Sequence, residues 1–163
     1  MAYIDKFETE DTQLISLLVQ DPVYYVRQQF VERICRYAAN GHLPCSFTIL
    51  LVLVAHEPEP TLKEKAKNFI IRQAKNQRSE GQELLEHEFV RLIHLLAHHP
   101  DFSREEEDVK LFESYLDFFI DAVATSENVS YIYYMSGQLK MVRDRSSENS
   151  EVDNFNVANL YIE

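Results

Sequence analysis

The sequence LLVQDPVYYVR, residues 17–27, predicts the junction between two antiparallel helices. Leu17-Leu18 ends one apolar helical pattern, and Asp21-Pro22 then interrupts the chain, because proline fits only the first turn of a helix. Val26 opens the next pattern, so we expect it to pack between the helices. We also expect Asp21 and Arg27 to pair as opposite charges, in a ladder that joins neighbouring units of a stack.

Apolar residues recur at helical spacing along almost the whole chain. Steps of three and four residues place each set on one face of a helix. The sets are Val26, Phe30, Ile34 and Tyr37; Leu62, Ala66, Phe69 and Ile70; Leu85, Phe89, Leu92 and Leu96; Phe112, Leu116, Phe119 and Val123; and Ile132, Met135, Leu139 and Val142. The run from Leu43 to Ala55 is apolar all round, which predicts a helix buried on most sides. A further amphipathic start lies at Val152 to Ile162.

The predicted helices pair at a regular interval. Second helices of the pairs begin near Pro22, Thr61 and Glu107, about 40 residues apart, which is the period of HEAT and armadillo repeats. We therefore expect an all-α fold, a HEAT-repeat α-solenoid segment of about four antiparallel helix pairs. It would span residues 1–163 as one piece of a much longer solenoid, because the last helical pattern is unfinished. A four-helix bundle is the alternative.

Composition narrows the class of partner and compartment. The 163 residues carry a net charge of −11, which argues against wholesale non-specific binding to nucleic acid or anionic membrane. The longest apolar stretch, Phe47 to Ala55, is too short to span a bilayer. Cys35 and Cys45 form no disulfide framework and suit a reducing compartment. We expect an intracellular protein without a cofactor.

Four histidines raise the possibility of a metal site. His94 and His98 are four residues apart and share one helix face, with His87 and His99 nearby in sequence. A metal-dependent enzyme using His87, His94 and His98 is therefore one alternative function. Hydrolytic zinc sites need a third ligand and a general base, and the order of His87 and Glu88 does not complete such a motif. Histidines near a helix C-terminus also interact favourably with the helix dipole, which is the simpler interpretation.

One predicted helix is rich in cations. Between Thr61 and Ser79 Glu64 is the one acidic residue, whereas six residues are basic. We predict that five of these contribute to binding a phosphate group or an acidic partner segment: Lys63, Lys67, Arg72, Lys75 and Arg78. Lys67, Lys75 and Arg78 are expected to share one exposed face. An ordinary solvated helix face is the alternative.

Aromatic residues gather near the C-terminal part of the predicted solenoid. The group comprises Tyr115, Phe118, Tyr131, Tyr133 and Tyr134. We expect core packing to explain most of them. Any exposed remainder could anchor a peptide, because aromatic side chains dominate the energetics of many interfaces.

The chain from about Leu85 onward resembles the C-terminal HEAT repeats of the cohesin-associated "precocious dissociation of sisters" family. The order and spacing of several pieces match together, whereas the first half matches only as a HEAT-like pattern. The pieces are Ile93 to Phe102, Leu111 to Val123, Leu139-Lys140, Val142-Arg143-Asp144, an acidic serine-rich loop at Ser146 to Ser150, and Asn159-Leu160-Tyr161. His99 and the tyrosine-rich helix differ from animal members and indicate a fungal-type or divergent member.

The resemblance implies a function that the residues alone do not. Members are long nuclear HEAT solenoids on chromosomes that bind the kleisin subunit of cohesin. With a release factor and an acetyltransferase they control the loading, maintenance and release of sister-chromatid cohesion, and they are not enzymes. This chain would be a scaffold segment of such a regulator, with direct DNA contact undecided and no membrane partner. A HEAT module of a transport receptor or coat adaptor is the alternative within the same fold.

Overall fold

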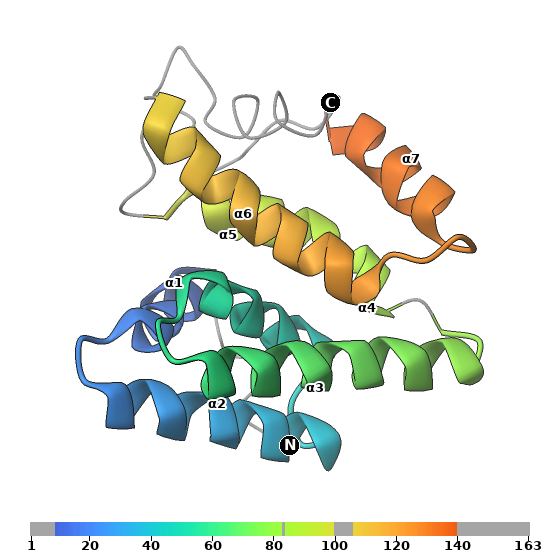
Figure 1. The fold of residues 1–163 in the computed structure, drawn as a ribbon. Coiled ribbons are helices and arrows are strands. Elements are labelled where there is room, and N and C mark those ends of the chain that lie inside the picture. Colours follow the sequence, from blue (N-terminus) through green and yellow to red (C-terminus); the bar gives the residue numbers. More distant parts are fainter. Residues whose placement is uncertain (1–8, 83, 100–105, 140–163) are drawn as a thin grey trace.

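The computed structural model describes residues 9–82, 84–99 and 106–139 (Figure 1), and all regular structure in these ranges is helical. The elements are α1 (Thr9–Ser16), the 3-10 helix η2 (Leu17–Gln20), α2 (Tyr24–Ala39), the 3-10 helix η3 (Cys45–His56), α3 (Pro60–Ser79), α4 (Leu84–His87), α5 (Phe89–Ala97), α6 (Glu106–Val123) and α7 (Val129–Leu139). The predicted all-α class is confirmed. The predicted start at 152–162 and the loop at 146–150 lie outside the described residues.

The second helices of successive pairs stack side by side. α2, α3 and α6 begin at Tyr24, Pro60 and Glu106, close to the predicted positions. α3 contacts both α2 and α6, and all three run in the same direction (Figure 1). Parallel neighbours of this kind arise when helix pairs repeat along a stack, as in a solenoid. The HEAT-type solenoid is therefore confirmed over the four-helix bundle.

The apolar run at 43–55 forms the centre of the core. All nine residues from Phe47 to Ala55 are buried, because η3 contacts α2, α3, α6, η2 and α4. The predicted helix buried on most sides is thus confirmed, although it is a 3-10 helix. A run that is apolar on every side contains no 3.6-residue stripe, so its sequence could not distinguish the two helix types.

Equivalent turns end α2 and α3. Gly41 has φ 67° and Gly81 has φ 70°, a left-handed conformation that favours glycine. The amide of His42 donates to the Tyr37 carbonyl at 2.8 Å, and the amide of Gln82 donates to the Gln77 carbonyl at 2.8 Å. Both turns are therefore Schellman motifs, which satisfy the last carbonyls of each helix. Each turn directs the chain into the next pair.

The predicted helix at 85–96 has one interruption. α4 ends at His87 and α5 begins at Phe89, with Glu88 between them. The hydrogen bonds nevertheless continue, from the Glu88 amide to the Leu84 carbonyl and from the Leu92 amide to the Glu88 carbonyl. The predicted inner face is buried throughout. In the described part of the chain, no helix is both long and apolar enough to cross a membrane.

Candidate functional site

The junction at 17–27 is joined to the next repeat by a buried ion pair. Arg27 donates from Nε to Glu57 Oε2 at 2.7 Å and from Nη2 to Glu57 Oε1 at 3.0 Å. Its Nη1 donates to the backbone carbonyl of Asp21 at 2.7 Å, whereas Asp21 Oδ1 accepts from the Val23 amide. The expected Asp21–Arg27 pairing is therefore corrected: the carboxylate partner of Arg27 is Glu57. Val26 is only half-buried.

Asp21 and Glu57 hold equivalent places in successive repeats. Each is followed by proline, and each accepts a hydrogen bond from the amide two residues further on. The offset between the repeats is 36 residues, and the same offset carries Arg36 onto Arg72. Arg27 of the first repeat thus pairs with Glu57, which is the counterpart of Asp21 in the second repeat. A pair of opposite charges between neighbouring repeats is what the sequence analysis expects of a charge ladder.

Two cations of α3 face α6. Lys63 donates to the Ala55 carbonyl, and its Nζ lies 5.9 Å from the centroid of the Phe118 ring. Lys67 pairs with Asp121 at 3.2 Å and lies 5.6 Å from the same ring centroid. Both side chains therefore make contacts within the solenoid, between its second and third repeats.

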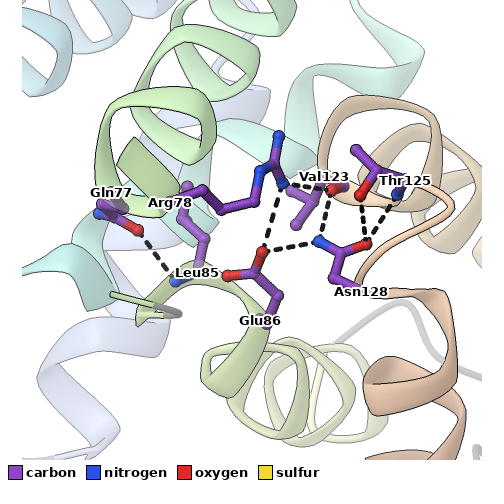
Figure 2. A network of polar contacts seen from close by, with 7 residues as sticks. All are labelled: Gln77, Arg78, Leu85, Glu86, Val123, Thr125 and Asn128. Carbon is purple, nitrogen blue, oxygen red and sulfur yellow. Dashed lines mark hydrogen bonds and ion pairs between the residues drawn. The ribbon is translucent and has the colours of Figure 1, made fainter. Parts of the chain in front are cut away.

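Arg78 belongs to a buried polar network (Figure 2). Its Nη1 donates to Glu86 Oε1 at 3.3 Å and to the Val123 carbonyl at 3.0 Å. Asn128 Nδ2 donates to the same two acceptors at 2.7 Å and 3.0 Å. Asn128 Oδ1 accepts from the amide and the hydroxyl of Thr125. The network joins the end of α3 to α4 and to the connection between α6 and α7.

The expectation that Lys67, Lys75 and Arg78 share one exposed face is wrong. Eight residues separate Lys67 from Lys75, a rotation of roughly 80° at 3.6 residues per turn. Lys67 and Arg78 lie at the edge of α3 that faces α6 and α4, whereas Lys75 is exposed. Spacing alone does not show which edge of a helix meets a neighbour, so this correction depends on tertiary contacts.

Four further exposed cations lie on the neighbouring helices α2 and α3. Lys65 on α3 pairs with Glu32 on α2 at 2.7 Å. Burial raises the pKa of Cys35 on α2, and the nearby charges of Lys65 and Arg72 oppose this, so these two cations lie at the seam between the helices. Arg36 lies on α2 itself, four residues after Glu32. We name Arg36, Lys65, Arg72 and Lys75 the α2–α3 basic surface; all four are exposed. The sequence interpretation missed Arg36, which the 36-residue offset from Arg72 could have revealed.

The histidines do not form a metal centre in the described residues. His87 Nδ1 lies 2.7 Å from the Tyr131 hydroxyl, and the rings of His94 and His98 are 4.4 Å apart between centroids. His99 is buried; its Nε2 lies 2.9 Å from Gln20 Oε1. Over residues 9–82, 84–99 and 106–139, no three His, Cys, Asp or Glu side chains are grouped to hold a metal ion. The metal-enzyme alternative therefore has no site there.

The aromatic group divides between core and surface. Tyr115 and Phe118 are buried on α6, as expected for core packing. Tyr133 and Tyr134 are 77% and 59% exposed on α7, and Tyr131 contacts His87. Tyr133 and Tyr134 are therefore the exposed aromatic residues that, by the sequence analysis, could anchor a peptide.

Both thiols lie partly buried against the core, and this allows a first prediction. Burial raises the pKa of Cys35 to about 11 and also raises the pKa of Cys45. An ordinary thiol pKa is about 8.5. Burial of the thiols therefore stabilises the fold below this pH, and the contribution is lost as pH rises toward 11. Because the thiolate is the reactive form, we expect slow alkylation of the native chain at neutral pH and fast alkylation after denaturation. Mass spectrometry after iodoacetamide treatment measures this; equally fast native labelling would contradict it.

Comparison with known proteins identifies the family. A family model described as "Sister chromatid cohesion protein PDS5 protein" matches residues 2–162, almost the complete chain. The chain belongs to the PDS5 family. The predicted resemblance is therefore correct, and it is wider than expected, since the PDS5 match also covers the first half.

Individual PDS5 proteins are similar over most of the chain. Sister chromatid cohesion protein pds5 of Schizosaccharomyces pombe is 34% identical over 87% of this chain. PDS5 of Saccharomyces cerevisiae is 33% identical over 83%, and PDS5 homolog A of Homo sapiens is 29% identical over 93%. The matched part is 12%, 11% and 13% of those proteins, so the chain spans about an eighth of their length. Higher identity to the two fungal proteins agrees with the expected fungal-type member.

Proposed function

We propose that this chain is a non-enzymatic scaffold segment of a sister-chromatid cohesion regulator. It would be one HEAT segment, residues 1–163, within a longer chromosome-associated nuclear solenoid. Its partners would be the cohesin kleisin subunit, together with a release factor and an acetyltransferase. The observation that carries the proposal is the PDS5 family match over residues 2–162, on a helical stack that presents exposed side chains from successive repeats.

The mechanism would be recruitment of partners by a rigid surface. Lys63, Lys67 and Arg78 have contacts within the solenoid, so they would act by holding its repeats together. Arg72 and Lys75 are exposed and available to a partner. Of the five predicted binding residues, we therefore propose these two as the direct contacts. Nothing in the described geometry favours a transport receptor or coat adaptor, and that alternative becomes an outcome of the test.

A pull-down tests the cohesin assignment. The immobilised chain is expected to retain the purified kleisin subunit at low salt, and less of it at physiological salt, since exposed charge pairs are screened. Arg72→Glu with Lys75→Glu should weaken retention by about tenfold. Arg78→Glu is unsuitable for this purpose, because it would place a second carboxylate beside buried Glu86.

The control for this pull-down is Arg91→Glu with Lys110→Glu. It makes the same change of charge at exposed positions on α5 and α6. Retention of the kleisin by this control at the level of the unmodified chain is the expected result. No retention of kleisin by the unmodified chain, alongside capture of transport or coat proteins, would reject the cohesin assignment.

A further inference from the structure

The cations of the chain are concentrated on two neighbouring helices. α2 and α3 carry nine of the 16 Lys and Arg residues, but only two of the 27 Asp and Glu residues, Glu32 and Glu64. The chain as a whole has a net charge of −11. The electrostatic character of these helices is therefore opposite to that of the rest of the chain, which attracts a partner of negative charge to this place.

The geometry makes this charge available across the seam between two repeats. α2 and α3 lie side by side and run in the same direction (Figure 1). Arg36 and Arg72 occupy equivalent positions, so their guanidinium groups repeat from one helix to the next. The Lys65 side chain is 48% exposed although it pairs with Glu32. Glu32 is the one acidic residue of α2 and is paired with Lys65, and Glu64 is the one acidic residue of α3.

The neighbouring helix limits the shape of the partner. α6 packs beside α3, and Glu113, Asp117 and Asp121 are exposed along it at steps of four residues. Asp121 already reaches Lys67. Duplex DNA carries one charge per 1.7 Å of axis on a broad cylinder, so its phosphates would also lie over the acidic helix. An extended polypeptide is narrow enough to follow the seam between α2 and α3 without crossing α6.

We infer that the α2–α3 basic surface binds an extended acidic polypeptide segment, with Arg36 and Arg72 as paired carboxylate contacts from successive repeats. Arginine is suited to this because its planar group binds a carboxylate through two hydrogen bonds. The inference rests on the proposed scaffold function and names the chemistry of its partner. The binding residues predicted from the sequence all lie on α3, whereas the inferred surface also includes Arg36 on α2, in the first repeat.

Fluorescence anisotropy with a labelled peptide of alternating glutamate and serine tests the inference. We compare Arg36→Glu with Lys75→Glu against the matched control Arg91→Glu with Lys110→Glu, both in the 163-residue chain. The first variant should weaken peptide binding by about tenfold and the control by less than about twofold. Circular dichroism verifies that both variants remain folded. A labelled DNA duplex and size-exclusion chromatography with light scattering complete the set.

Each outcome decides the inference. Selective loss in the Arg36/Lys75 variant supports it. No peptide binding, equal loss in both variants, tighter binding of the duplex, or a dimer broken by the same variant would overturn it. Peptide binding without kleisin retention would leave the acidic-segment inference standing and remove the cohesin assignment. Kleisin retention that is insensitive to Arg36 and Lys75 would keep the cohesin assignment, but it would overturn the acidic-segment inference and the proposal that Lys75 contacts the kleisin.

Discussion

Glu86→Ala is expected to lower the free energy of unfolding by about 3 kcal/mol. Glu86 is 0% exposed, and its Oε1 accepts from both Arg78 and Asn128. Without the carboxylate, Arg78 Nη1 and Asn128 Nδ2 would share one acceptor among the described residues, the Val123 carbonyl. Loss of one partner from a buried ionic network costs more than the network contributes, because the other groups stay buried without partners.

Urea unfolding followed by circular dichroism measures this effect. Glu88→Ala is the matched control, since Glu88 lies two residues away and, within the described part of the chain, pairs with exposed Arg91 at 3.5 Å. It should change the free energy of unfolding by less than about 1 kcal/mol. Glu86→Gln keeps an acceptor for both donors and should be intermediate. Among the described buried side-chain atoms, Glu86 Oε2 has no hydrogen-bond partner. An unchanged midpoint for Glu86→Ala would contradict the prediction and would show that the network does not stabilise the folded state.

Glu57→Ala is expected to cost about 2 kcal/mol at neutral pH. Side-chain exposures of 13% for Arg27 and 1% for Glu57 show that solvent reaches this pair mainly from the Arg27 side, and its two hydrogen bonds join the first repeat to the second. The substitution removes the carboxylate that both guanidinium donors reach. The chain would retain its helices but lose a connection on which the stacking of two repeats depends.

The dependence on pH separates this ion pair from simple packing. Hydrogen bonding by Arg27 holds the pKa of Glu57 below its usual range. The stabilisation is therefore present above the ordinary glutamate pKa of about 4.3 and is lost as pH falls through the lower pKa of the folded state. The midpoints of the unmodified chain and of Glu57→Ala should converge in acid. Glu32→Ala, which removes the more exposed pair with Lys65, should leave the midpoint nearly unchanged. A constant difference across pH would contradict the ionic explanation.

Helices and core positions were predictable because they depend on local spacing. The steps of three and four residues located the buried residues of α3 and α5, such as Phe69 and Leu92, and the prolines located the starts of α2 and α3. The basic character of α3 was equally visible. What spacing could not show is which edge of α3 meets α6, because that depends on how whole helices stack. Lys67 and Arg78 were for this reason assigned to solvent.

The sequence by itself determined an all-α repeat fold, its approximate period and its family, since these follow from apolar periodicity and from residues in a fixed order. Only the tertiary structure decided how the charges are distributed. It paired Arg27 with Glu57 and buried Glu86 between Arg78 and Asn128. It also placed Lys65 of α3 against Glu32 of α2 across a repeat boundary. The physical reason is that a charge is stabilised or exposed by its neighbours in space, and in a solenoid those neighbours lie one repeat away in sequence.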